Sequence, residues 1–391
     1  MSAQEIPLRY GINPHQTPAR AFVEQGTLPL TVLNGAPGYI NILDLLHGWQ
    51  LVKELKAALG LPAAASYKHV SPAGAAVAVP LSDTLKRAYF VDDLELTPLA
   101  TAYARARGAD RMSSFGDAIA LSNPCDLATA RMIAREVSDC IIAPGYQPQA
   151  LDILRKKHDG KYLVMQIDPS YTPPPMDTRV LFGITLEQRR NDRVIGMEIL
   201  DKIVTRNTTL PDSAKRDLLV ATIALKYTQS NSVSLALDGQ IIGLGAGQQS
   251  RIHCTRLAAD KARNWFLRQH PVVLSLPFKP DLGRAELNNA VDQYLLEDML
   301  PEAEEAWLQN FAARPKRLNP RDRKDWLKGL SGVSFSSDAF FPFRDSIECA
   351  RQVGVKYIVE PGGAVRDDVC IQAADEYDMV MAFSGLRLFT H

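Results

Sequence analysis

The sequence has no excess of charge of either sign, because its 391 residues include 44 Lys and Arg against 44 Asp and Glu. Without a net positive charge or a long basic run, no extended field attracts a polyanion such as DNA. The chain also lacks an uninterrupted apolar stretch of membrane-spanning length, and its start, MSAQEIPLRYG, has no apolar signal core. We therefore expect a cytoplasmic protein that binds neither nucleic acid nor membranes and meets its ligands with a few placed groups.

Cysteine is scarce and scattered, with no C-x-x-C pair and no histidine at ligand spacing among Cys125, Cys140, Cys254, Cys349 and Cys370. This spacing argues against a disulfide framework and against a zinc site. An isolated cysteine without an activating partner is usually a small buried apolar residue. We interpret all five cysteines in this way.

The chain is long enough for two or three domains, and its hydrophobic content of 46% is enough for sizeable cores. Strand-like and helix-like stretches alternate, which favours an α/β fold with a parallel or mixed sheet. The clearest break in composition is PSYTPPP at 169–175, where we expect a first unit to end. A final unit starts near Pro271, and both units contain a strand, a polar loop, a helix, a strand and a PG turn. This similarity indicates a duplication.

The stretch YKHVSPAGAAV, residues 67–77, places two titratable side chains beside apolar residues. The apolar run before Lys68 predicts a buried strand, and Ser71 and Pro72 are typical of an N-cap and a first helical residue, so we predict a helix from there on. Lys68 and His69 would then lie at a strand end that faces a helix N-terminus, where α/β proteins gather ligands. The alternative is a solvated lysine and a core-edge histidine at a tight turn.

Two further stretches suggest ligand recognition. The amides and hydroxyls of TQSN, residues 228–231, precede an apolar strand and suit hydrogen bonding to a planar polar ligand. The glycines of GLGAGQQSR, residues 243–251, allow the backbone to approach a ligand closely. This glycine pattern is not the dinucleotide fingerprint, because it lacks the G-x-G-x-x-G spacing after a first strand. The alternative for either stretch is an ordinary turn.

Aromatic and arginine side chains add weaker signals. Phe115, in RMSSFGDAIALS, lies between small polar residues and can stack a heterocycle, and SSDAFFPFRD at 336–345 repeats that pattern. Aromatic residues are more often part of the core. Arg9 and Arg387 lie near opposite ends of the chain, and two converging arginines can clamp a phosphate, although most arginines are surface residues.

Taken together, these stretches resemble one family. RYGINPHQ, KHVSPAG, RMSSFGD, REVSD, TQSNSV, GAGQQSRIHC, SSDAFFPFRD and a final RLF-x-H occur in this order, and they are similar to the 5-aminoimidazole-4-carboxamide ribonucleotide (AICAR) transformylase domain of purine biosynthesis. The resemblance covers essentially the whole chain. The family usually carries an IMP cyclohydrolase domain before this one, and because the chain opens shortly before RYG, we expect a stand-alone transformylase without cyclohydrolase activity.

The resemblance also implies a fold and an assembly. It implies two cytidine-deaminase-like αβα units at 1–170 and 271–391, a connecting region at 171–270, and a homodimer with active sites at the interface. The zinc signature of the deaminases, His-x-Glu with Pro-Cys-x-x-Cys, is missing, because NPCDLA has no second cysteine. A monovalent cation such as K⁺ is implied near TQSNSV, where Thr228, Ser232 and Asp338 offer oxygens. Oxygen-rich loops are common, however, and we assign no residue to a metal.

The roles implied by the resemblance fall into three sets. The catalytic residues would be Lys68, His69, Asn231 and His391. The ribonucleotide AICAR would be bound by Arg9, Tyr10, Gly116, Asp139, Asn231, Arg251, Phe340 and Arg387. The co-substrate 10-formyltetrahydrofolate, a reduced folate, would contact Met112, Phe115, Ile252, Asn289, Pro342, Phe343 and Asp345. The chain departs from the family's pattern at Ser346, where some members have Asn, and at Thr390, where many have a basic residue.

The implied reaction is formyl transfer to the 5-amino group of AICAR, which gives formyl-AICAR and tetrahydrofolate. The amine is a poor nucleophile and the folate nitrogen must leave protonated, so acid–base help is needed, for which His69 is suited as base and Lys68 as an oxyanion stabiliser or acid. Two alternatives stay open. One is a catalytically silent nucleotide-binding homologue, and the other is a formyltransferase for a different aminoimidazole or one-carbon donor.

Overall fold

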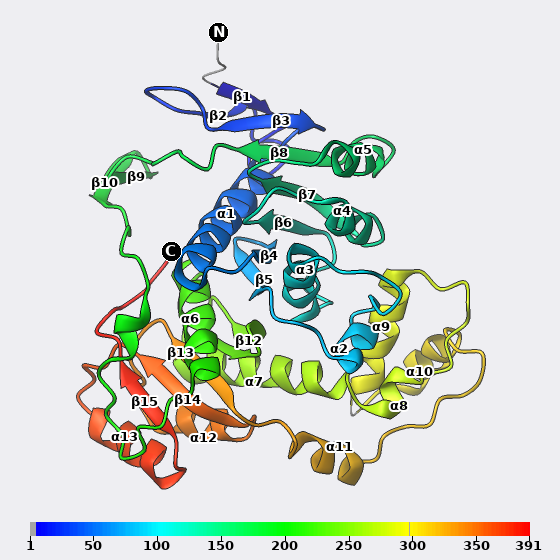
Figure 1. Cartoon of the computed structure of the whole chain (residues 1–391), viewed down its shortest axis with the longest axis vertical. Coiled ribbons are helices and arrows are strands. Elements are labelled where there is room, and N and C mark those ends of the chain that lie inside the picture. Colours follow the sequence, from blue (N-terminus) through cyan, green and yellow to red (C-terminus); the bar gives the residue numbers. More distant parts are fainter. Residues whose placement is uncertain (1–4, 297) are drawn as a thin grey trace.

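A computed structural model describes residues 5–296 and 298–391. Within these residues, eleven strands form one mixed sheet that extends from β3 at one edge to β15 at the other (Figure 1). The fold is therefore α/β, as expected. In spatial order the strands are β15 (Val380–Phe383), β14 (Val355–Glu360), β13 (Val333–Ser337), β11 (Val233–Leu237), β12 (Gln240–Gly245), β5 (Ser71–Val77), β4 (Ala63–Lys68), β6 (Asp117–Leu121), β7 (Ser138–Ala143), β8 (Leu163–Ile167) and β3 (Leu30–Asn34).

Helices cover both faces of this sheet. On one face lie α1 (Tyr39–Leu59) and α6 (Asp212–Lys226), and on the other lie α3 (Pro98–Gly108), α4 (Leu127–Ala134), α5 (Pro148–Lys156), α7 (Arg251–Leu267), α12 (Asp345–Arg351) and α13 (Asp367–Glu376). Each face has its own core. In β4, Ala63, Ala65 and Tyr67 pack toward α1 and α6, whereas Ala64 packs toward α3, as the alternation of side chains along a strand requires.

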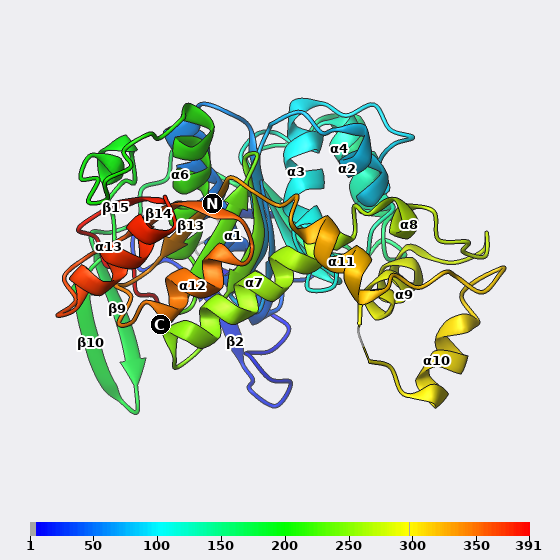
Figure 2. The same cartoon turned by 90° about the horizontal axis from the view of Figure 1, so that it is seen from below.

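The remaining elements do not belong to the strands of this sheet or to the helices named above. A satellite core is formed around α8 (Pro271–Leu274), α9 (Arg284–Leu295), α10 (Pro301–Leu308) and α11 (Pro320–Leu327), which project from one end in Figure 2. Two separate hairpins consist of β1 (Glu5–Leu8) with β2 (Ala19–Phe22) and β9 (Met176–Leu181) with β10 (Ile184–Arg189). The short elements α2 (Asp83–Ala88) and η1 (Met197–Leu200) connect larger ones. None of the described helices is both long and apolar enough to cross a membrane.

The two halves of the sheet repeat one order of elements. In the first half, α1 is followed by the β4–β5 hairpin, and β4 pairs antiparallel with β6, which begins the parallel row β6, β7, β8. In the second half, α6 is followed by the β11–β12 hairpin, and β11 pairs antiparallel with β13, which begins the parallel row β13, β14, β15. The halves meet where β12 pairs with β5. The repetition is one of topology, and a cytidine-deaminase-like identity for either unit stays a prediction.

The predicted division at 171–270 and 271–391 also stays a prediction. The strands β11 and β12, from the predicted connecting region, form hydrogen bonds with β13 and β5 on either side. Residues 171–211 of the connecting region contribute no strand to the main sheet and contain the exposed β9–β10 hairpin.

One element predicted from the sequence is wrong. Ser71–Val77 is the strand β5, not a helix, and it pairs with β4 through a tight turn. The cause is the packing around Gly74, because a Cβ at this position would lie 2.1 Å from the carbonyl oxygen of Ala106 in α3. The small residues of this run let a helix lie directly on a strand that is buried on both faces, and this packing outweighs helix propensity.

Candidate active site

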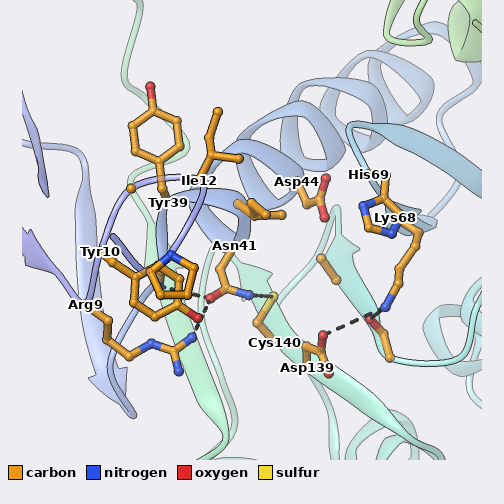
Figure 3. A pocket seen from close by; sticks show the side chains of 16 residues that line it. Arg9, Tyr10, Ile12, Tyr39, Asn41, Asp44, Lys68, His69, Asp139 and Cys140 are labelled. Atoms are coloured by element: carbon orange, nitrogen blue, oxygen red, sulfur yellow. Dashed lines mark hydrogen bonds and ion pairs between the residues drawn. The ribbon is translucent and has the colours of Figure 1, made fainter. Parts of the chain in front are cut away.

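A cavity of about 290 Å³ lies between the start of α1, the turn that joins β4 and β5, and the strands β6 and β7 (Figure 3). Its walls include the first residues of α1 on one side and the Lys68–His69 pair on the other, so residues far apart in the sequence face one space. Six residues predicted from the sequence line it: Arg9, Tyr10, Lys68, His69, Gly116 and Asp139.

The side chain of Lys68 extends along one wall of this cavity toward Gly116 and Asp139. Its Nζ donates a hydrogen bond of 2.7 Å to the carbonyl oxygen of Gly116 and lies 4.0 Å from Oδ2 of Asp139. Gly116 has φ +69°, and a Cβ added there would lie 2.8 Å from Lys68 Nζ. Only glycine therefore combines this backbone conformation with room for the ammonium group.

His69 lies in a strained two-residue turn. Lys68 and Ser71 are paired across the hairpin, and the residues between them, His69 and Val70, have φ of +53° and +60°. Such turns favour Asn and Gly, and a β-branched residue in this region costs on the order of 1–3 kcal/mol. The alternation of side chains along β4 ends at this turn. Lys68 and His69 therefore both reach the cavity although they are adjacent.

Asp44, in α1, holds the turn in place. Its Oδ1 accepts a hydrogen bond of 2.6 Å from the backbone amide of Val70, and the residue is 5% exposed. Burial raises the pKa of the Asp44 carboxyl, and the Val70 amide and the nearby His69 and Lys68 oppose this rise. Asp44 is not among the residues predicted from the sequence, although a carboxylate three residues after Asn41 on an apolar helix is a usable signal.

Arg9 lies at the opposite end of the cavity, beside the start of α1. Its Nη2 donates to Oδ1 of Asn41 at 3.3 Å, and the same oxygen accepts from the backbone amide of Gly38 at 2.9 Å. A helix N-terminus and an arginine are both favourable surroundings for an anion. The helix start expected near Lys68 is thus present at this cavity, but it belongs to α1. An adjoining cavity of about 290 Å³ shares Arg9, Asn41 and Asp139 and adds His158 and Lys161.

Asn231 and Arg251 form a second group, and neither lines the cavity of Lys68. Arg251, the first residue of α7, donates to Oδ1 of Asn231 at 3.0 Å, to the carbonyl oxygen of Ser232 at 2.8 Å and to the buried carboxylate of Asp338. Ser232 also donates to Asp338, through its amide at 2.9 Å and its hydroxyl at 3.0 Å. This network fixes the side chain of Asn231.

The monovalent cation implied near TQSNSV stays a prediction, and the oxygens named for it also form hydrogen bonds within the chain. Both carboxylate oxygens of Asp338 already accept hydrogen bonds from Arg251 and Ser232. The hydroxyl of Thr228 donates to the carbonyl oxygen of Ala224 at 2.7 Å. In the described part of the chain, no group of three or more His, Cys, Asp and Glu side chains is arranged to hold a metal ion. We derive no chemical step through a metal.

The last residues of the chain lie beside this second group. The amide of Leu388 donates to the carbonyl oxygen of Asp338 at 2.8 Å. Arg387 and His391 are exposed, and each packs near the ring of Phe389. Phe340, which follows β13, is 44% exposed. The predicted nucleotide contacts Asn231, Arg251, Phe340 and Arg387, and the predicted catalytic residue His391, are thus absent from the lining of the Lys68 cavity.

The predicted folate contacts are also divided. Met112, Phe115 and Asn289 line a mostly apolar cavity of about 340 Å³ between the loop before β6 and α9. The other four lie on the second half of the chain: Ile252 in the first turn of α7, Pro342 and Phe343 between β13 and α12, and Asp345 at the start of α12. Phe115 and Phe343 are 53% and 68% exposed.

A buried charge network supports the Met112–Gly116 loop. Arg107 lies 2.6 Å from Asp117 and 3.2 Å from Glu136, and Arg111 lies 2.9 Å from Glu136. All four side chains are almost completely buried. Removing one member would leave an uncompensated charge in the interior, which costs far more stability than the loss of an ion pair at the surface. The network therefore fixes the loop that carries Phe115 and Gly116.

The cysteines behave as small core residues. Cys125, Cys140, Cys254 and Cys370 are buried, and Cys349 is half-buried. Cys254 contacts a predicted site residue, since its Sγ donates to the carbonyl oxygen of Asn231 at 3.0 Å. Burial raises the pKa of Cys254 to about 11, so the group is a thiol at neutral pH.

Glu360 is a buried carboxyl near Arg251 that sequence analysis did not identify. It ends β14, is 1% exposed, and accepts from the amide of Gly362 at 3.2 Å through Oε2, while Oε1 has no hydrogen bond of normal geometry from the described residues. Burial raises the pKa of Glu360 to about 7, with Asp367 adding to the rise and the amides of Gly362 and Phe341 and the charge of Arg251 opposing it.

Comparison with known proteins identifies relatives along nearly the whole chain. The family model described as AICARFT/IMPCHase bienzyme matches residues 1–261. Three curated relatives, each named bifunctional purine biosynthesis protein PurH, come from Magnetococcus marinus, Roseobacter denitrificans and Xylella fastidiosa and are 33%, 32% and 31% identical to the chain. The alignments cover 98% of this chain in each case. The chain spans 59%, 59% and 58% of the length of these relatives.

The Asp44–Val70 hydrogen bond predicts a stability effect. Asp44→Ala should lower the free energy of unfolding by about 1.5–3 kcal/mol, because a buried charge-assisted bond is lost and the strained turn keeps an unpaired amide. Asp44→Asn keeps an acceptor oxygen and should cost clearly less. Urea denaturation at pH 7 measures both variants. Equal stability of wild type and Asp44→Ala would contradict this role.

Burial of Glu360 predicts a dependence of stability on pH. The ordinary pKa of a glutamate, which applies in the unfolded chain, is 4.5, whereas the pKa of Glu360 in the folded protein is about 7. Between these two pH values, the folded protein therefore binds one more proton at Glu360 than the unfolded chain does. Stability should therefore fall as pH rises through this window, by an amount on the order of 2–3 kcal/mol from this group.

Glu360→Gln isolates this contribution, because glutamine does not titrate. Urea denaturation at pH 4.5, 6 and 8 gives the free energy of unfolding of wild type and of Glu360→Gln. The wild-type value minus the Glu360→Gln value should decrease as pH rises and change little above pH 8. A difference that is flat across the window would show that Glu360 ionises normally in the folded state.

Proposed function

We propose that this chain, which belongs to the AICARFT/IMPCHase bienzyme family, transfers the formyl group of 10-formyltetrahydrofolate to the 5-amino group of AICAR. The curated relatives are bifunctional purine biosynthesis proteins, and the chain spans about three fifths of their length. Of the two activities in the family's description, we assign formyl transfer to these 391 residues and not IMP cyclohydrolase activity, because the motifs along the chain are those of the transformylase domain. We also propose that the repeated halves are cytidine-deaminase-like units.

The observation that carries the proposal is the shared cavity of Arg9, Tyr10, Lys68 and His69. An arginine beside a helix N-terminus suits the phosphate of a ribonucleotide, and an acid–base pair at the other end suits a reaction at its amine. The cavity volume of about 290 Å³ is near the lower limit for small-molecule sites, which fits a mononucleotide better than a dinucleotide.

The residues of the cavity suit the chemistry of the transfer. The AICAR amine attacks the formyl carbon, a C–N bond forms, and the bond from that carbon to the folate N10 breaks. His69 accepts the proton that the amine loses and returns a proton to N10 as that nitrogen leaves, so no net proton is taken up or released. Lys68, which carries its charge between Gly116 and Asp139, stabilises the oxyanion that develops on the formyl oxygen.

The second group of predicted residues supports a homodimer. Asn231 does not line the cavity of Lys68, and the folate contacts are divided between the two halves of the chain. We propose that one subunit supplies Lys68 and His69 and its partner supplies Asn231, Arg251, Phe340, Arg387 and His391 to the same site. The exposed rings of Phe115 and Phe343 are then covered by reduced folate and the second subunit.

A formylation assay with purified protein, AICAR and 10-formyltetrahydrofolate tests the function, with His69→Ala beside wild type. Wild type should form formyl-AICAR and tetrahydrofolate. His69→Ala should lower kcat by about 10²–10⁴-fold with AICAR affinity nearly intact, because a general base acts in the transition state.

Two outcomes would overturn these assignments. If calorimetry shows that AICAR binds but neither formyl-AICAR nor tetrahydrofolate is formed, the protein is a silent nucleotide-binding homologue. A His69→Ala protein with a lowered melting temperature and near-normal kcat would make this histidine a structural residue.

Subunit mixing tests the shared site. Lys68→Ala and Asn231→Ala proteins should each be inactive, and refolding them together should restore activity, since a mixed dimer has one site with both residues intact. About a quarter of the wild-type activity is expected for random pairing, with one intact site in half of the dimers. If no activity returns although mixed dimers form, Lys68 and Asn231 act from the same chain.

A further inference from the structure

Residues 388–391 are fastened to the TQSN loop by a reciprocal pair of hydrogen bonds between Thr390 and Ser230. The amide of Ser230 donates to the carbonyl oxygen of Thr390 at 2.9 Å, and the amide of Thr390 donates to the hydroxyl of Ser230 at 3.0 Å. Both residues are half-buried. The two segments are 160 residues apart in the sequence, so this contact is a tertiary one and is formed only when the second half of the chain is folded.

A third bond anchors this pair to the body of the protein. The hydroxyl of Thr390 donates to the carbonyl oxygen of Lys226 at 2.9 Å. Lys226 ends α6, and its buried ammonium lies 2.7 Å from Oε2 of Glu54 in α1. Thr390 is therefore connected through one hydrogen bond to a helix end that is itself fixed by a buried ion pair.

Two of the four predicted catalytic residues lie directly next to Ser230 and Thr390. Asn231 follows Ser230 directly, and His391 follows Thr390 directly. A shift of either backbone moves the side chain that comes next, since consecutive Cα atoms are joined by a rigid peptide unit. The same helix end also receives the hydroxyl of Tyr67, which donates to the carbonyl oxygen of Tyr227 at 2.8 Å just before Lys68.

We propose that Thr390 and Ser230 are positioning residues that set the places of Asn231 and His391. This inference rests on the proposed formyl transfer, because its readout is kinetic. Neither hydroxyl needs to touch a substrate. Their role is to hold the loop and residues 388–391 in one register, so that a predicted catalytic amide and a predicted catalytic imidazole approach the reacting groups together.

The test uses Thr390→Val, which keeps the size and β-branching of the side chain and removes only the hydroxyl. We expect kcat to fall about ten- to hundredfold, as small misplacements of catalytic groups do, while the KM for AICAR changes by less than about twofold. Thr390→Ser restores the donor and should recover most of the activity. Ser230→Ala removes the acceptor of the Thr390 amide and should reproduce the loss from the other side of the contact.

Thr205→Val is the matched control. The hydroxyl of Thr205 also donates to a backbone carbonyl oxygen, that of Asn207, at 2.9 Å, but it lies beside β15 and has no bond to the TQSN loop. The Thr205→Val variant should alter the melting temperature at least as much as Thr390→Val does and leave kcat unchanged. This comparison separates a positioning role from a general loss of stability.

The outcomes distinguish the two proposals. Wild-type protein without formylation activity would refute the proposed function. With wild type active, a Thr390→Val protein of normal kcat would refute the positioning role, as would an equal fall in kcat for Thr205→Val. If Thr390→Val does not fold, Ser230→Ala and Thr390→Ser decide the question, and normal kcat in Ser230→Ala would then overturn the inference.

Discussion

The turn between β4 and β5 is the constraint on which the arrangement depends. These two strands lie at the middle of the sheet, where β4 pairs with β6 of the first half and β5 pairs with β12 of the second. With only His69 and Val70 between the paired ends, both residues adopt left-handed conformations that their side chains disfavour. The carboxylate of Asp44 compensates part of this cost by accepting the Val70 amide. The strain thus occurs where two titratable side chains must face one cavity, as is common at functional sites.

The helices α1 and α6 carry this constraint to the second half of the chain. Glu54 of α1 forms a buried ion pair with Lys226 of α6 and also accepts from the hydroxyl of Tyr227 at 2.5 Å. α1 carries Asp44 under the Lys68–His69 turn, and the end of α6 accepts hydrogen bonds from Tyr67 and Thr390. Both groups of predicted site residues are therefore held from one pair of packed helices. A buried ion pair of this kind adds little net stability to the fold, but it leaves few alternative arrangements of the two helices.

Much of this could be predicted from local sequence, and the exceptions have one cause. The strand at 63–68 and the helix at 39–59 follow from their apolar patterns and from Gly60, which ends α1 with φ +69°. The run at 71–77 was misread because its small residues serve close packing against α3, which only the tertiary fold shows. Asp44 was missed for the same reason, since its partner is a backbone amide in another element. The TQSN and GAGQQSR stretches were interpreted separately as ligand-recognition loops, and neither the hydrogen bond between Asn231 and Arg251 nor that between Arg251 and Asp338 was predicted.

The exposure of aromatic side chains agrees with the proposed sharing of the site between two subunits. Phe115, Phe340 and Phe343 leave 53%, 44% and 68% of their surface in solvent, although each lies next to residues predicted to bind ligand. Covering such rings gains roughly 25 cal/mol for each Å² of apolar surface removed from water. A planar heterocycle takes up only one face of a ring, so a ligand alone leaves the other face and the edges wet. A second chain that brings the Asn231 group to the Lys68 cavity would cover the remainder, and the binding of folate and the association of subunits would then stabilise each other.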